Sequence, residues 1–278
     1  MSDRKRECQW RNFGFSGVSR ERFYIWQWRV PPIVIVIYRI LITSYLTTTL
    51  WYNTLTYHSP IPWPAFSTYW TYTLLTTYHV AHAVVVVHHV WASTCHNFLS
   101  RPSHEEHHRP FQAPKENSHP AEGTELIVRN QQENELPLHL IFLWIMYTVV
   151  NTACPAVTCG FYLFIATEKT AIQPRELFVH ALNSVVVLID QMVSAIPVRL
   201  LHFPFPVVFG LLYYLFSIVY WMADHKHVIY KAVLDWNHPT LPFGVIFVTS
   251  FWAVVLHCIS YGIYRGRLAI YYRLVRGN

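Results

Sequence analysis

The sequence predicts an all-α fold, a polytopic membrane bundle of six transmembrane helices with both termini in the cytoplasm. Six long apolar runs, few charged residues and loops of unequal basic charge lead to this prediction. A helix rises ~1.5 Å per residue, so roughly 20 apolar residues cross a hydrocarbon core of ~30 Å. Backbone groups in lipid must bond one another, which favours helices. The expected spans are Pro31–Trp51, Phe66–Val90, Leu138–Phe164, Leu177–Ile196, Pro204–Met222 and Leu241–Ile263.

The composition agrees with a single membrane domain. Of the 278 residues, 53% are hydrophobic and 13% are charged, whereas about 25% is the usual charged share of a soluble domain. The first residues are polar and the first apolar run begins near residue 30, so we expect a signal anchor rather than a cleaved signal peptide. The expected parts are a cytoplasmic N-terminal segment (1–29), a transmembrane domain (30–265) that includes a flexible cytoplasmic loop (91–137), and a cytoplasmic tail (266–278).

The distribution of basic residues predicts the orientation. Sixteen Lys and Arg residues lie on the side that carries both termini and the long loop, and four lie on the other side. The positive-inside rule therefore places the termini in the cytoplasm of an integral, multi-pass protein of the plasma membrane or an endomembrane. The net charge of +6 favours anionic membrane lipids as partners. Nucleic acid is not an expected partner, since no basic folded domain is left over.

No metal or other cofactor is predicted. The run from His104 to His108 matches the pattern H-E-x-x-H, which binds zinc when a helix places its two histidines one turn apart. Here Pro102 and Pro110 bracket the run, so a flexible His-rich loop is the expected structure. We also expect Pro155 to break the third span.

Two charged residues inside the spans predict a buried ion pair. Arg39 and Asp190 each lie about two turns from the predicted cytoplasmic end of their helices, so they share a depth. Charges at this depth are costly unless they are paired. In the alternative, Arg39 extends to the headgroups and Asp190 is neutral or paired elsewhere.

A hydroxyl and an imidazole are expected at the opposite membrane face. Thr68 opens the second span and His180 opens the fourth, with Asn183 about one turn later. A hydroxyl nucleophile beside an imidazole base is the minimal arrangement for covalent catalysis, and Asn183 could stabilise an oxyanion. In the alternative, Thr68 bonds its own helix, as threonines in membrane helices commonly do.

A set of short segments distributed along the chain forms a recognisable pattern. The segments are Trp10–Phe15, Gln27–Trp28, Tyr38–Arg39, Thr68–Trp70, His180–Asp190, Pro197–Phe203, Phe209–Tyr213, Phe216–Tyr220, Tyr230 and Val233–Trp236. Together they resemble the rolling stone family of animal membrane proteins. The resemblance covers nearly the whole chain and is densest from residue 177 to 264. The prototype of that family is associated with myoblast fusion, so the resemblance implies a role in membrane organisation or cell–cell fusion and protein partners at loops or helix faces.

A more distant resemblance is to the androgen-induced multi-pass hydrolases, which cleave fatty-acid esters of hydroxy fatty acids with a Thr and a His. In that family the Thr opens one membrane helix, and the His opens another, ten residues before an acidic residue. Thr68, His180 and Asp190 match this pattern. The resemblance implies an intramembrane lipid-ester hydrolase as the second reading of the chain. A transporter is the third, although no internal repeat supports it.

Overall fold

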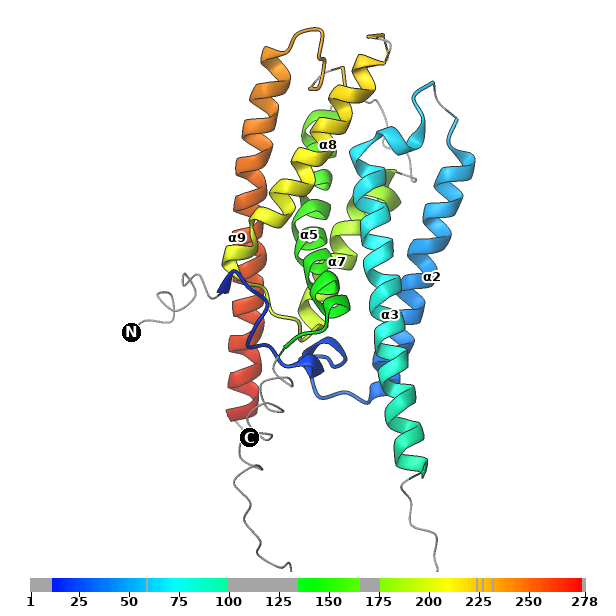
Figure 1. The fold of residues 1–278 in the computed structure, drawn as a ribbon, viewed down its shortest axis with the longest axis vertical. Helices are drawn as coiled ribbons and strands as arrows, with labels where there is room; N and C mark the ends of the chain where they lie inside the picture. The colour runs from blue at the N-terminus through cyan, green and yellow to red at the C-terminus, as the bar shows by residue number, and fades with distance from the viewer. Residues whose placement is uncertain are drawn as a thin grey trace, which may run out of the picture.

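The computed structural model describes residues 12–58, 60–99, 135–165, 176–223, 225–226, 228–231 and 233–276, and this part of the chain is helical (Figure 1). Its long helices run side by side in one bundle. They are α2 (Pro32–Thr56), α3 (Ser67–Leu99), α5 (Leu138–Gly160), α7 (Leu182–Val193), α8 (Pro204–Met222) and α9 (Thr240–Arg276). The π-helical turn η4 (Phe161–Ile165) extends α5, and the π-helical turn η6 (Leu177–Ala181) precedes α7.

Within the part of the chain that the structure describes, four helical stretches are long and apolar enough to cross a membrane. They are Pro32–Thr56, Leu138–Leu163, Leu200–Met222 and Thr240–Val275, and Leu177–Val193 is a shorter apolar helix. The helix α3 is not one of these four. It is a continuous helix of 33 residues, but its Thr, Tyr and His side chains lower its mean hydropathy. All six of the expected helices are thus present in the structure. That all six cross a membrane, and in which orientation, remains a prediction.

Proline marks the start of several helices. Pro32 and Pro204 begin α2 and α8, and Pro137 immediately precedes α5. Proline suits the first helical turn because the N–H that it lacks would have no partner there. The prediction of a break at Pro155 is wrong, because α5 is continuous through it. One lost hydrogen bond costs less than an irregular backbone in apolar surroundings.

The helix α5 is the centre of the bundle and packs against α3, α7, α8 and α9. In its apolar stretch of membrane length, 61% of the residues are buried, whereas in the corresponding stretches of α2, α8 and α9 the buried share is 17% each. The outer helices expose large aliphatic and aromatic residues such as Leu41, Leu215 and Phe247. An apolar surface around a polar-containing core is what a lipid environment requires.

Two helices are longer than the predicted spans. The α3 helix continues past Val90 to Leu99, and α9 continues past Ile263 to Arg276. Residues 91–99 and 266–276 are thus helical, although we expected a flexible loop and a tail. The remainder of the long loop, with the His104–His108 run, lies outside the described residues.

The N-terminal segment crosses one end of the bundle and lies at the same end as the last turns of α9 (Figure 1). It pairs with the backbone after α7, since the Gln27 N–H donates to the Val193 carbonyl (2.9 Å) and Trp26 forms a β-bridge with Ser194. The Trp28 indole N–H donates to the Met192 carbonyl (2.9 Å), and Phe23 is fully buried. From residue 12 this segment is therefore part of the fold.

Candidate functional site

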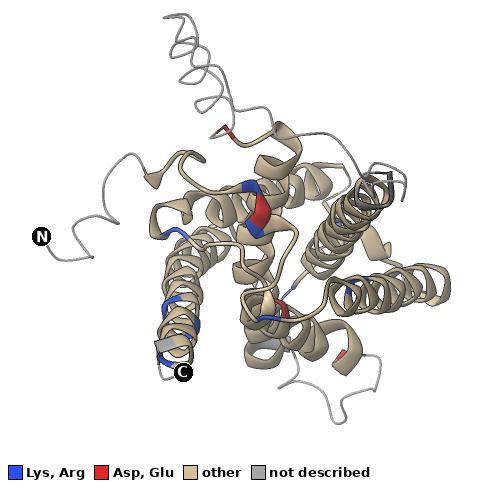
Figure 2. Ribbon diagram, turned by 90° about the horizontal axis from the view of Figure 1, so that it is seen from below, with Lys and Arg blue, Asp and Glu red and all other residues tan. Residues whose placement is uncertain are grey.

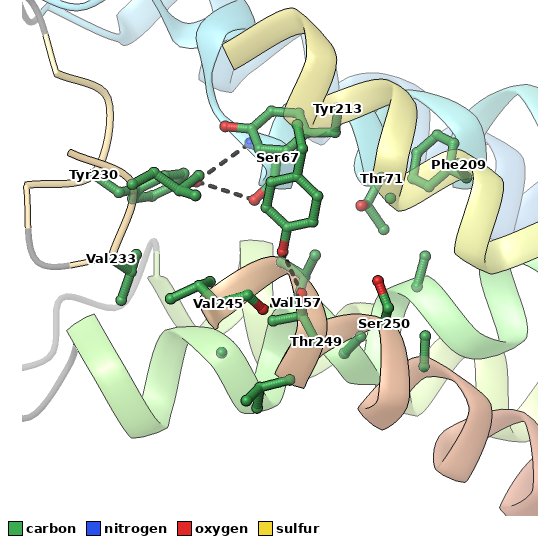
Figure 3. Close-up of a pocket in the computed structure, with 18 of the residues that line it drawn as sticks. Ser67, Thr71, Val157, Phe209, Tyr213, Tyr230, Val233, Val245, Thr249 and Ser250 are labelled. Atoms are coloured by element: carbon green, nitrogen blue, oxygen red, sulfur yellow. Dashed lines mark hydrogen bonds between the residues drawn. The ribbon is translucent and has the colours of Figure 1, made fainter. Parts of the chain in front are cut away.

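An apolar cavity of about 540 Å³ lies between α3, α5, α8 and α9 (Figure 3). Aliphatic and aromatic side chains together form most of its wall, and Phe209 lies at one side. Three helices each contribute a glycine at which an added Cβ would meet no atom within 4 Å. These residues are Gly160 of α5, Gly210 of α8 and Gly244 of α9. The missing side chains leave room for a guest, and the wall suits a hydrocarbon chain.

Hydroxyl groups lie on several walls of the cavity, and those of Ser67 and Tyr230 lie together on one side (Figure 3). The Tyr230 hydroxyl lies 3.1 Å from Ser67 Oγ and accepts a hydrogen bond from the Ser67 N–H (3.2 Å). Burial raises the pKa of Tyr230, so this hydroxyl stays protonated. On another wall, the Tyr214 hydroxyl lies 2.6 Å from Thr249 Oγ1. A ligand with a polar head and an apolar chain would find a partner for each part.

Both residues of the expected Thr–His pair line this cavity. Thr68 lies in the first turn of α3, and His180 lies in the π-helical turn η6. The imidazole stacks on Phe161, with ring centroids 3.7 Å apart. Thr76 and Thr77 donate to carbonyls four residues earlier, whereas Thr68 contacts the Tyr230 hydroxyl.

The other three expected site residues lie elsewhere in the described part of the chain. The Asn183 side chain donates to the Val179 carbonyl in the preceding π-helical turn η6. Asn183, Asp190 and Arg39 are absent from the described residues that line the cavity. The structure therefore brings Thr68 and His180 to one site and the two charged residues to another.

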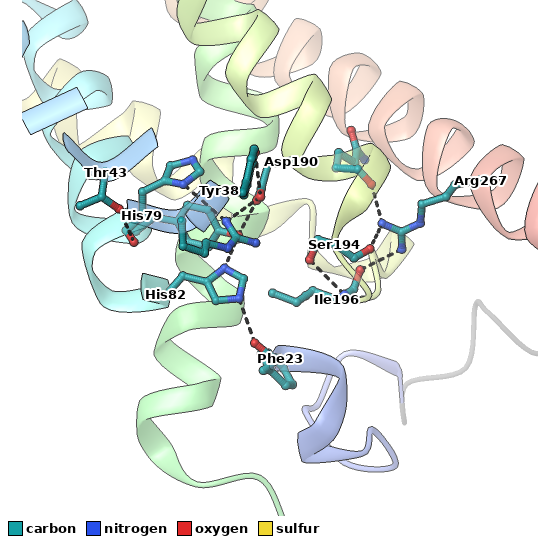
Figure 4. Close-up of polar contacts among 12 residues, drawn as sticks. Phe23, Tyr38, Thr43, His79, His82, Asp190, Ser194, Ile196 and Arg267 are labelled. Carbon is teal, nitrogen blue, oxygen red and sulfur yellow. Dashed lines mark hydrogen bonds and ion pairs between the residues drawn. The ribbon is translucent and has the colours of Figure 1, made fainter. Parts of the chain in front are cut away.

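Arg39 and Asp190 form the ion pair expected from their depth (Figure 4). Arg39 Nη1 lies 2.6 Å from Asp190 Oδ1, and both side chains are 1% exposed. The Tyr78 hydroxyl donates to Asp190 Oδ2 (2.7 Å). Burial of Arg39 rules out the alternative in which it extends to the headgroups.

A histidine joins this pair to the N-terminal segment. His82 Nε2 lies 2.9 Å from the Phe23 carbonyl and therefore donates to it, while His82 Nδ1 lies 3.0 Å from the Tyr78 hydroxyl. That hydroxyl has one proton but faces both Asp190 and His82. It donates to Asp190 and also lies within hydrogen-bond distance of His82 Nδ1. Arg39, Asp190, Tyr78 and His82 are thus one connected network.

Arg267 holds the backbone beyond α7 (Figure 4). Its guanidinium donates to the carbonyls of Gln191 (2.5 Å), Ser194 and Ile196 (3.3 Å), and the side chain is 1% exposed. We expected Arg267 in the cytoplasmic tail. No sequence pattern signals its role, since its acceptors are backbone carbonyls distant in sequence.

The sequence reasoning also missed Tyr230 and the three cavity glycines. The glycines carried a signal, because each interrupts an otherwise bulky apolar run. Among the described residues, no group of three or more His, Cys, Asp or Glu side chains could hold a metal ion.

Comparison with known proteins identifies relatives of this chain. A family profile described as "Protein rolling stone" matches residues 122–275, which is more than half of the chain. The curated "Protein rolling stone" of Drosophila melanogaster is 24% identical over 149 residues, which cover 50% of this chain and 54% of that protein. The match therefore spans about half the length of that relative. No solved structure matches. The family profile covers His180, Asn183 and Asp190, and Arg39 and Thr68 lie outside it.

Proposed function

The chain belongs to the rolling stone family, and from that membership we propose that it is a multi-pass membrane protein that acts in membrane organisation or cell–cell fusion by holding a lipid chain in its cavity. The observation that carries the proposal is the apolar cavity with the Ser67 and Tyr230 hydroxyl groups side by side in its wall. A fatty acyl chain bound there would be withdrawn from the surrounding leaflet. Each buried CH₂ group contributes about 0.8 kcal/mol relative to water, but lipid tails already lie in hydrocarbon. Selectivity would therefore depend on shape and on the polar end.

A fusion assay tests this role. Two cell populations carrying complementary halves of a fluorescent reporter are mixed after expression of wild type, Gly210→Trp or Gly262→Trp. We expect wild type to raise the number of double-content cells and Gly210→Trp to return it to background, because the indole fills the cavity. Gly262 of α9 is exposed and lies outside the cavity lining, so Gly262→Trp should resemble wild type.

Fusion that is equally strong with both tryptophan variants would remove the cavity from the mechanism. Fusion at background with wild type, at normal surface expression, would contradict the fusion role. Membrane organisation would then be tested through lipid binding alone.

A second candidate function is hydrolysis of lipid esters, favoured by the presence of both Thr68 and His180 in the lining of the cavity. Thr68 Oγ would attack the ester carbonyl while His180 takes the hydroxyl proton and passes it to the leaving alcohol. Water would then release the acid from the threonine ester, with His180 again as base.

Labelling with a fluorophosphonate lipid probe tests the hydrolase. We expect labelling of wild type and its loss, by roughly 100-fold or more, in Thr68→Ala and His180→Ala, because general-base catalysis contributes about 10²–10⁴-fold. Thr76→Ala is the matched control, since that hydroxyl bonds its own helix. Unlabelled wild type that is folded and inserted would contradict the hydrolase and leave the lipid-holding role standing.

A further inference from the structure

A second cavity of about 570 Å³ lies where the N-terminal segment crosses the bundle. It is formed by the N-terminal segment, the first turn of α2, the end of α3 and one residue of α9. This end of the molecule is shown in Figure 2, where basic positions mark the N-terminal segment and the last turns of α9. The lining residues that the argument uses are Arg22, Arg29, Trp28, Pro32, Ile35 and Tyr271.

The polar part of this cavity is cationic. Its described lining contains Arg22 and Arg29 but no Asp or Glu. Arg22 uses Nε to donate to the Ala195 carbonyl (3.0 Å), and neither arginine is paired with a carboxylate in the described part of the chain. Glu21 is the neighbouring acidic residue, but it is exposed and outside the lining. Two guanidinium groups that have no carboxylate partner among the described residues favour an anion beside the cavity, and phosphate matches the geometry of a guanidinium group.

The hydroxyl groups in the same wall do not compete for this role. Ser93 and Thr94 donate their protons to the carbonyls of His89 and Val90, at 2.8 Å in both cases. Of the remaining donors in the lining, which include the Trp26 indole N–H, the two arginines carry a permanent charge, so binding of an anion should depend on them.

An apolar part of the wall lies where α2 enters its apolar run. Pro32 and Ile35 belong to the first turn of α2, which crosses the bilayer in our account. The Trp28 indole meets the Tyr271 ring edge to face, with centroids 6.2 Å apart. Trp and Tyr side chains are typical of the headgroup level of a membrane. An occupant at this level would have a charged head beside the arginines and an apolar tail toward α2.

We infer that this cavity binds the phosphate-bearing headgroup of an anionic phospholipid, with Arg22 and Arg29 contacting the headgroup and its acyl chain passing Ile35. The two arginines belong to the N-terminal segment, which also pairs with the backbone beyond α7. A bound lipid would thus link that segment to the start of α2. The site is separate from the cavity that contains Thr68 and does not depend on its function.

Native mass spectrometry of the full chain in detergent tests the inference, with phosphatidylserine and phosphatidylcholine of equal chain length as probes. We expect wild type to retain phosphatidylserine preferentially. Arg29→Gln should weaken that retention roughly five-fold, the effect of one basic residue near an anionic surface. Arg29→Lys, which keeps the charge, should retain most of it. Arg273→Gln, an exposed position of α9 outside the cavity, is the matched control.

Three outcomes would overturn the inference: equal retention of both lipids by wild type, equal loss in Arg29→Gln and Arg273→Gln, or displacement of the lipid by excess inorganic phosphate. The last result would show a site for free phosphate. Arg29 is exposed, so its substitution leaves the fold intact, and an unchanged unfolding midpoint would confirm this.

Discussion

Asp190→Asn should lower the free energy of unfolding by about 3–5 kcal/mol, because it leaves the buried Arg39 guanidinium without its counter-charge. The amide keeps the shape of the carboxylate and an acceptor for the Tyr78 hydroxyl, so the change isolates the charge. Arg39 is 1% exposed and has no route to water without moving α2. The measurement is the midpoint of thermal unfolding in detergent, followed by tryptophan fluorescence.

The double variant Arg39→Met/Asp190→Leu distinguishes loss of a charge partner from loss of packing. We expect it to recover most of the stability, because replacing a buried pair by apolar residues of similar size is often neutral or stabilising. Recovery should be incomplete, since the Tyr78 hydroxyl then loses its acceptor on Asp190. The control is Glu21→Gln, the same chemical change at an exposed position. A midpoint for Asp190→Asn equal to that of wild type would show that the pair does not stabilise the fold.

Filling the lipid cavity is the second change with a large expected effect. Gly210→Trp with Gly244→Phe places two aromatic side chains in the space that the glycines leave open. Because the two rings would occupy the volume that an acyl chain needs, lipid retention should fall strongly relative to wild type. Stability should not fall, because glycine inside a helix costs roughly 0.5–1 kcal/mol relative to alanine.

The parts of the fold that depend on membrane physics could be predicted from the sequence. Apolar runs of membrane length gave the six helices, and equal depth in two of them gave the Arg39–Asp190 pair. The shared position of Thr68 and His180 in one cavity followed from helix direction alone. Each inference used only the depth of a residue along the membrane normal, which its position in the sequence of the helix determines.

The features that depend on rotation about helix axes could not be predicted in this way. Arg267 looked like a tail residue because hydropathy falls after Ile263, but α9 continues and turns this side chain toward three carbonyls. Hydropathy marks where a helix leaves lipid, whereas a helix ends where its backbone hydrogen bonds end. The packing of the N-terminal segment against the bundle was not predicted for a related reason. Its backbone pairs with Val193 and Ser194, which are distant in sequence.

The most direct test of the account is photo-crosslinking of the wild-type chain in membranes that contain a phospholipid with a diazirine at the end of one acyl chain. Peptide mapping by mass spectrometry then locates the modified residues. We predict modification of residues that line the larger cavity, such as Val157, Phe209 and Val248, and its loss in Gly210→Trp/Gly244→Phe but not in Gly262→Trp. Modification confined to exposed positions such as Leu41 and Phe247, and unchanged when the cavity is filled, would contradict lipid binding in this cavity.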